Sequence, residues 1–409
     1  MEAIVNHIKY TLSHSTFYSA KKSEFASVYN DNFTVKDFQK LPFTTKDEFS
    51  LNNDLFLAVD KNKVAEYSTT SGTSGTPVTV YLTKKDLNRL AKNEYDSLKL
   101  MGFTSKDIFQ LMTTIDKQFM AGLAYYLGVQ KLNAGIIRVG PGVIESQLKS
   151  ILTYQPTALI AVPSFIISLI NYAKQNAIDL NQTSVKSIVC IGEPIRKQDF
   201  SLNILGDKIT SEWNVELFST YASTEIGVAF SECKMHQGNH VNDDLAFVEV
   251  INETSDQPVK EGEIGEIVVT PLKTTGTPLI RYKTGDLAKA YYKKCACGKT
   301  SLRIGPIVGR KNQMIKFRGT TIYPNAIFDV LENFPEIQLY KVEISKDEFE
   351  NDQIRILIST QNELLINDLN KKLKSKLKVT PQISFVEKEK LYNLVHTSKS
   401  RKPCKIEFI

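Results

Sequence analysis

Near the start of the chain stands Tyr67-Ser68-Thr69-Thr70-Ser71-Gly72-Thr73-Ser74-Gly75-Thr76-Pro77, a segment rich in side-chain hydroxyls with two glycines. Glycine lets a backbone approach a ligand closely, and N–H groups together with hydroxyls can satisfy the oxygens of a polyphosphate. The same composition also suits a flexible Ser/Thr/Gly linker, and composition alone favours that linker. The rest of the sequence must therefore decide between the two.

Length and composition describe a globular protein of more than one domain. The 409 residues suggest two or three domains, and 42% hydrophobic with 23% charged residues is typical of a folded chain. The 51 basic and 45 acidic residues are interspersed, without a basic block that carries stacking aromatics. A nucleic-acid partner is therefore unsupported.

The sequence predicts neither a secretion signal nor a membrane span. An acid stands near the N-terminus where a signal peptide would have basic residues, and the longest apolar run, 159–173, is interrupted and shorter than a bilayer span. We expect a cytoplasmic protein. The five cysteines, an odd number, favour free thiols or a metal site over a disulfide framework.

Hydrophobic periodicity predicts an α/β fold. Helical segments with capping patterns at Thr34 and Thr45 fill the first 60 residues, and the segment after the hydroxyl-rich loop predicts a strand and an amphipathic helix. Between residues 108 and 230, buried strands alternate with helices, which indicates a largely parallel sheet. These strands are expected at 134–139, 158–162, 187–191 and 215–221.

Chemically interesting segments follow two of these strands. Gly192-Glu193-Pro194 and Thr220-Tyr221-Ala222-Ser223-Thr224-Glu225 each come directly after a strand. Active sites in such sheets lie at the carboxyl ends of the strands. From about residue 246 the alternation becomes that of a smaller antiparallel β unit, and a separate α+β pattern fills the last hundred residues. We expect a large domain over residues 1–309 and a small, mobile C-terminal domain over 310–409.

Four sequence motifs occur in an order that resembles a known enzyme family. The hydroxyl-rich loop is followed by Tyr-Ala-Ser-Thr-Glu at 221–225, Thr-Gly-Asp at 284–286 and Gly-Arg at 309–310. The chain resembles the adenylate-forming, AMP-binding superfamily of acyl-CoA synthetases, and within it the phenylacetate-CoA ligases. The subfamily is indicated by the segment 41–47, Leu-Pro-Phe-Thr-Thr-Lys-Asp, and by Cys295-Ala-Cys297-Gly298. A P-loop enzyme would instead carry Gly-Lys-Ser/Thr after the loop.

The resemblance implies a role for each motif residue. Glu225 would help to bind Mg²⁺, Thr224 would contact the α-phosphate, Asp286 would accept the ribose hydroxyls, and Arg310 would reach the same ribose. The remaining expected nucleotide contacts are Ser71, Gly72, Thr73, Ser74, Gly75 and Thr76 in the phosphate loop, with Glu193, Tyr221, Ala222 and Ser223 beside it.

The C-terminal domain is expected to supply a catalytic lysine. In this superfamily the domain rotates about a hinge that falls here on Asn312, exchanging the adenylating lysine for a thiol tunnel. Lys402 matches that lysine best, although Arg401 replaces the usual glycine and Lys399 is a rival.

The cysteines predict a structural zinc site. Cys295 and Cys297 form a tight knuckle, and with Cys233 and His240 they would supply three thiolates and an imidazole to tetrahedral Zn²⁺. His236 is an alternative imidazole. Relatives of phenylacetate-CoA ligases carry a similar pattern. The acyl group is expected beside Glu225.

The function implied is that of an acid–thiol ligase. It would adenylate a carboxylic acid, aromatic and phenylacetate-like in this family, with ATP and Mg²⁺, and then transfer the acyl group to CoA. One alternative loads the phosphopantetheine of an acyl-carrier protein instead, and another is a nucleotide-binding protein without ligase activity. A homodimer is left open.

Overall fold

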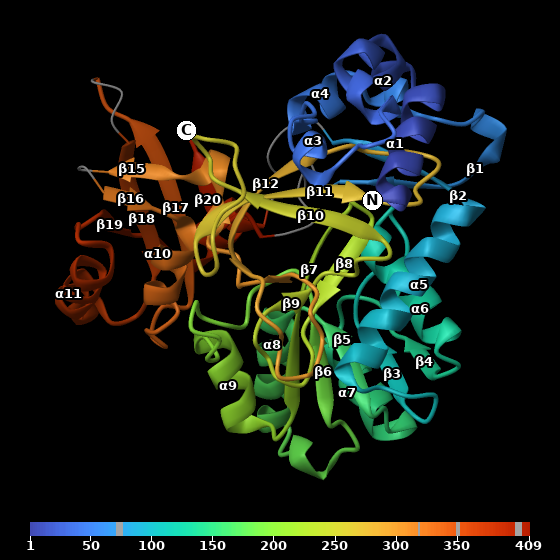
Figure 1. The fold of residues 1–409 in the computed structure, drawn as a ribbon. Coiled ribbons are helices and arrows are strands. Elements are labelled where there is room, and N and C mark those ends of the chain that lie inside the picture. The colour runs from blue at the N-terminus through green and yellow to red at the C-terminus, as the bar shows by residue number, and fades with distance from the viewer. Residues whose placement is uncertain (71–76, 318–319, 349–351, 397–402) are drawn as a thin grey trace. The chain divides into compact units, whose positions relative to one another are not determined.

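The structure is a computed structural model that describes residues 1–70, 77–317, 320–348, 352–396 and 403–409 (Figure 1). Contacts within the chain divide the described residues into two compact units, one that ends at Ile307 and one that begins at Val308. Each unit has its own hydrophobic core. The two are described separately below.

Short helices and a hairpin begin the first unit. The helices are α1 (Glu2–His14), α2 (Thr16–Ala20), α3 (Val35–Phe38) and α4 (Lys46–Leu51). The side chains of Thr34 and Thr45 cap α3 and α4 reciprocally with the third helical residue, so both predicted helix starts are confirmed. Strands β1 (Val64–Thr69) and β2 (Thr79–Thr83) then pair antiparallel on either side of the hydroxyl-rich loop.

A parallel sheet with helices on both faces forms the centre of this unit, as predicted (Figure 1). Its strands are β3 (Ile108–Leu111), β4 (Gly135–Arg138), β5 (Ala158–Ala161), β6 (Ser187–Cys190) and β7 (Glu216–Ser223). Ile160, Val189 and Phe218 pack beneath α5 (Lys84–Met101) and α6 (Met120–Lys131). Their neighbours in sequence pack beneath α7 (Ile144–Tyr154), α8 (Pro163–Gln175) and α9 (Ile204–Glu212). Because successive strand residues face opposite sides, a sheet covered on both faces needs continuous apolar runs.

The sheet continues into antiparallel strands. The order is β10-β11-β12-β13-β9-β8-β7-β6-β5-β3-β4, antiparallel from β10 to β7 and parallel beyond. The added strands are β8 (Val228–Ser231), β9 (Asn239–His240), β10 (Ala246–Ile251), β11 (Ile264–Pro271), β12 (Tyr282–Tyr291) and β13 (Arg303–Ile304). The expected antiparallel β unit is therefore present, but it is hydrogen-bonded into the same sheet. Two of the connecting strands have only two residues each, too few for a periodic signal.

The second unit has an α+β fold. A sheet of order β19-β18-β17-β20 packs with α10 (Pro324–Leu331) and α11 (Ile366–Leu377) around the core. Leu369, Leu373 and Leu377 of α11 share that core with the alternating isoleucines of β18, as their spacing predicts. The other elements are β14 (Gly309–Arg310), β15 (Ile315–Phe317), β16 (Thr320–Ile322), β17 (Leu339–Lys346), β18 (Asp352–Ser359), β19 (Gln382–Phe385), α12 (Lys388–Val395) and β20 (Ile406–Phe408).

The longest apolar run of the sequence is divided between two elements. Its first residues form β5, and Pro163 starts α8. Throughout the part of the chain that the structure describes, no helix combines the length and the apolar character that crossing a membrane requires.

Candidate active site and metal centre

The two ends of the hydroxyl-rich loop are held together. The backbone N–H of Thr70 donates to the carbonyl of Val78 at 3.1 Å, and the N–H of Val78 donates to the Thr70 hydroxyl at 3.0 Å. The Thr69 N–H donates to the carbonyl of Gln118, just before α6. The six predicted phosphate-binding positions, Ser71, Gly72, Thr73, Ser74, Gly75 and Thr76, lie outside the described residues.

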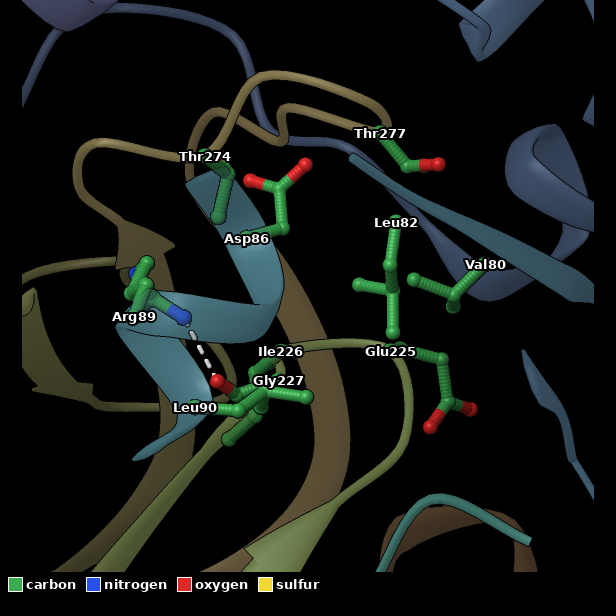
Figure 2. Close-up of a pocket in the computed structure, with 10 residues that line it drawn as sticks. All are labelled: Val80, Leu82, Asp86, Arg89, Leu90, Glu225, Ile226, Gly227, Thr274 and Thr277. Carbon is green, nitrogen blue, oxygen red and sulfur yellow. Dashed lines mark hydrogen bonds between the residues drawn. The ribbon is translucent and has the colours of Figure 1, made fainter. Parts of the chain in front are cut away.

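The turn from β7 to β8 presents Glu225. The Glu225 side chain is 10% exposed, and its carboxylate has the Lys46 ammonium 3.6 Å away and the Tyr282 hydroxyl at 3.5 Å. In Figure 2 its side chain extends away from the carbonyl of Gly227, which ends the turn. The carboxylate is thus held between a cation and a donor while part of it stays open. Thr224, beside it, is partly buried.

The Tyr221 hydroxyl donates to the Asp286 carboxylate at 2.9 Å, although 65 residues separate the two in sequence. Residues 284–286 form a bulge in β12, since Glu266 pairs with Leu287 but Val268 pairs with Lys283. Gly285 has a φ of +75°, a conformation that suits glycine at this bulge. The Thr-Gly-Asp motif is therefore a bulge that directs Asp286 toward β7.

The other residues of the Tyr-Ala-Ser-Thr-Glu motif differ in their surroundings. Ala222 is exposed and lies on the face of β7 opposite to Tyr221, because strand side chains alternate. Tyr221 therefore lies on the side of Asp286, and Ala222 on the other face of the strand. Ser223 is the last residue of β7. Glu193 accepts two hydrogen bonds at 2.9 Å, from the N–H and the hydroxyl of Ser164 at the start of α8.

The remaining expected nucleotide residues lie in the second unit or outside the described chain. Arg310 belongs to β14, and Asn312 to the single helical turn that follows it. Lys402 lies outside the described residues.

Arg89 of α5 hydrogen-bonds to the turn that carries Glu225. Its guanidinium donates to three backbone carbonyls, those of Gly227 at 2.5 Å, Leu245 at 2.6 Å and Leu272 at 2.7 Å (Figure 2). Burial lowers the pKa of Arg89 to about 10, against the opposing charge of Asp86. One turn earlier, the Asp86 carboxylate accepts from the N–H groups of Thr275 and Gly276. The first turns of α5 thus join the hairpin, the Glu225 turn and the loop after β11.

Sequence analysis did not find three of these contacts. Lys46 lies in the segment 41–47 but had no role assigned to it, and Tyr282 lies two residues before the Thr-Gly-Asp motif. Arg89 carried no such signal, because an arginine on an amphipathic helix usually faces solvent.

Cys233, His240, Cys295 and Cys297 gather in one place. Their ligand atoms all lie within 4.8 Å of one another, although 62 residues separate Cys233 from Cys295. The Cys233 and Cys295 sulfurs are 3.8 Å apart, and the Cys297 sulfur is 3.6 Å from His240 Nε2. A tetrahedral zinc with ordinary bond lengths would space these pairs by about 3.8 Å and about 3.6 Å.

The surroundings of the cluster suit a neutral imidazole ligand. Burial, with the nearby charges of Arg303 and Lys299, lowers the pKa of His240 to about 4. Its Nδ1 pairs with the Ser301 hydroxyl at 3.0 Å, which orients Nε2 toward Cys297. His236, the alternative imidazole, instead contacts Glu232 and Glu216.

Two family models match the sequence of this chain. The family model described as AMP-binding enzyme matches residues 9–272, and that of the AMP-binding enzyme C-terminal domain matches residues 319–402.

The chain belongs to the AMP-binding enzyme family. Among characterised relatives of this AMP-binding enzyme is a phenylacetate-coenzyme A ligase from Thermus thermophilus, 30% identical over 74% of this chain and 67% of the relative. A phenylacetate-coenzyme A ligase from Pseudomonas putida is 23% identical over 92% and 87% of the two chains. The fold matches a solved 2-hydroxyisobutyryl-CoA ligase with a TM-score of 0.84 and 19% identity, covering all of this chain and 89% of that one.

These matches confirm the resemblance to adenylate-forming enzymes and, within them, to phenylacetate-CoA ligases. They also confirm the expected enzyme class, an ATP-dependent acid–thiol ligase.

Proposed function

We propose that this enzyme adenylates an aromatic, phenylacetate-like carboxylic acid and transfers the acyl group to CoA, releasing AMP and pyrophosphate. The observation that carries the proposal is the pairing of Tyr221 with Asp286 beside the Glu225 turn. The Tyr-Ala-Ser-Thr-Glu motif, the Thr-Gly-Asp motif and the segment 41–47 are distant in sequence but contact one another or their neighbours here. Nucleotide activation by this family requires such an arrangement.

The first half-reaction places an acid carboxylate in line with the α-phosphate of ATP. A partly open carboxylate is a ligand that Mg²⁺ prefers, so Glu225 would hold the ion that supplies charge neutralisation at the phosphates. Thr224 would contact the α-phosphate, and Asp286, oriented by Tyr221, would accept the ribose hydroxyls. Lys46 lies 3.6 Å from Glu225 and would add positive charge beside the phosphates.

The proposed identities of the acid and of the thiol acceptor are supported by the names of the relatives. Those at 23–30% identity are named for phenylacetate and coenzyme A, which supports an aryl acid and CoA. The exposed Ala222, small and next to the Glu225 turn, leaves space for a flat ring.

ATP–pyrophosphate exchange over a panel of aryl and alkyl acids tests the proposal. We expect exchange with at least one aryl acid, followed by consumption of CoA. Silence with every acid would contradict adenylation. Offering that acid's adenylate to CoA and to a phosphopantetheine-bearing carrier protein, at equal concentrations, tests the acceptor, and a faster reaction with the carrier would contradict the choice of CoA.

We also propose that the cluster of Cys233, His240, Cys295 and Cys297 binds one structural Zn²⁺. Four protein ligands fill a tetrahedral zinc, which leaves no position for substrate. We expect about one zinc per chain by elemental analysis, lost in Cys295→Ser together with thermal stability. Cys404→Ser, which changes a cysteine of the second unit, is the matched control and should keep the metal. A metal-free preparation of unchanged stability would contradict a structural role.

A further inference from the structure

An open strip runs along one face of β7, away from the catalytic turn. Phe218 packs beneath α5 and α6, so Thr220 and Ala222, two and four residues on, lie on that same face. Ala222 is exposed and Thr220 is partly exposed. An acid whose carboxylate lies at the Glu225 turn can therefore extend along this face toward Thr220.

The inner end of the strip is closed by polar side chains. The Tyr125 hydroxyl of α6 lies 3.5 Å from the hydroxyl of Thr220, and Ser231 of β8 pairs directly opposite Thr220. Glu94 of α5 lies against Gly128 of α6, where an added Cβ would come within 2.2 Å of the Glu94 Cβ. Burial, and then the nearby negative charge of Glu94, raise the pKa of Tyr125 well above its ordinary range, as expected where both groups lie between the two helices. We call Asn93, Glu94, Tyr125, Thr220 and Ser231 the polar floor.

Three atoms of the polar floor lack a hydrogen-bond partner among the residues that the structure describes. They are Glu94 Oε2, Asn93 Oδ1 and Ser231 Oγ. Their residues are 3%, 1% and 1% exposed. Asn93 uses its amide nitrogen on Glu94 and on the carbonyl of Ala229, which leaves its oxygen as an acceptor. The amide oxygen of Asn93 can only accept, the Ser231 hydroxyl can accept or donate, and the ionised Glu94 carboxylate accepts, so a single donor group from a ligand can be accepted by each of them.

The adenylation chemistry does not use these groups. Burial raises the pKa of Glu94 to about 7, with only the Asn93 amide opposing the shift. An apolar side chain at this position would pack without that desolvation, so the carboxyl is costly unless a ligand completes its hydrogen bonds.

We propose that Glu94 determines acid specificity, and that the preferred acid carries a hydrogen-bond donor, a hydroxyl or an amino group, at the end remote from its carboxylate. This inference rests on the proposed function, because that function places the acid's carboxylate at Glu225. The remote group would donate to Glu94, with Ser231 as its second partner. An unsubstituted aryl acid would leave the acceptors buried and unpaired.

Binding of unreactive adenylate mimics tests the inference without requiring turnover. The probes are the acylsulfamoyl adenosines of phenylacetic, 4-hydroxyphenylacetic and 4-aminophenylacetic acid, with affinities measured by calorimetry. We expect the wild-type enzyme to bind one of the substituted probes at least about 10-fold more tightly than the unsubstituted one, since a site built to hydrogen-bond a polar group rejects its absence strongly. Glu94→Leu should remove or reverse that ratio, and Ser231→Ala should reduce it.

The controls separate this inference from the proposed function. Glu94→Gln keeps the side-chain volume if Glu94→Leu fails to fold, and should also lower the ratio. Lys92→Met, on the same helix but partly exposed and paired with Asp96, should leave it unchanged. Equal binding of all probes to the wild type would overturn the inference, even if the aryl-acid exchange succeeds. Preferential binding without exchange would support the polar floor and contradict only the ligase activity, whereas no binding of any probe would contradict both.

Discussion

Glu94 couples the protonation of one buried carboxyl to the stability of the first unit. Its pKa rises from 4.5 to about 7 on folding, because burial disfavours the charged form. The folded state therefore binds the proton more tightly than the unfolded state does. The associated stability is complete below pH 4.5 and is lost as the pH rises through 7, which amounts to about 3 kcal/mol.

We expect Glu94→Gln to remove this pH dependence. Urea unfolding followed by the fluorescence of Trp213, the single tryptophan, reports on the same unit, because Trp213 is buried beneath α8 and α9. Between pH 5 and 8, the free energy of unfolding of the wild type should fall relative to that of the variant. His7 acts in the opposite direction, since burial lowers its pKa to about 4, but it is common to both proteins. A constant difference across this pH range would contradict the raised pKa of Glu94.

At the scale of single residues, the sequence predicted functional residues only where they belong to short recognisable motifs. The four cluster residues were found because cysteine and histidine have few structural roles at such spacing. Glu94 and Arg89 were missed because each is a charged residue on an amphipathic helix, where solvent exposure is the usual outcome. Their burial follows from the close approach of α5 to α6 and to β8, which pairwise spacing along one helix does not reveal.

Helix α5 holds the turn that carries Glu225 against two other segments of the first unit. Arg89 donates to the carbonyls of Gly227, Leu245 and Leu272, which belong to three separate segments. We expect Arg89→Met to lower the free energy of unfolding by about 2–4 kcal/mol, because buried carbonyls that lose their donors keep their desolvation cost. Adenylation should also slow, since Gly227 ends the turn that carries Glu225.

The matched variant is Lys92→Met on the same helix. Its side chain is 44% exposed and its ammonium pairs with Asp96, so we expect both stability and exchange rate to stay close to the wild type. Urea unfolding and pyrophosphate exchange measured on the two variants decide the matter. If Arg89→Met matched Lys92→Met in both measurements, Arg89 would not hold the turn.

At the level of elements, the long periodic segments were predictable and the short connections were not. The parallel strands β4, β5, β6 and β7 were expected from apolar runs, and the structure has them at those places, whereas β3 was not predicted. Strands β9 and β13 are too short for a pattern, yet they join the antiparallel strands to the parallel ones in a single sheet. The bulge at 284–286 is likewise set by the pairing with β11, which a turn-like sequence of three residues does not specify.

The whole molecule has two compact units, and a family model matches residues in each of them. The motifs predicted this family because they occur along the chain in the family's order, although each motif alone is short. The family models match both parts of the chain. What the sequence could not supply is the spatial relation between Glu225 and Lys402, which lie in different parts of the chain. We propose that it rotates about Asn312 between the two half-reactions, and that Lys402 serves only the first.

Substitution of Lys402 tests this division of labour. We expect Lys402→Ala to slow pyrophosphate exchange by about 100-fold or more, because the positive charge that stabilises the transition state is lost. Transfer to CoA from supplied acyl-adenylate should change much less, since that step would use the other orientation of the second unit. Lys399→Ala is the matched control, three residues away in the same basic segment, and should leave both half-reactions near the wild type. Equal losses in both half-reactions for Lys402→Ala, or a larger loss of exchange for Lys399→Ala, would contradict the assignment of the adenylating lysine.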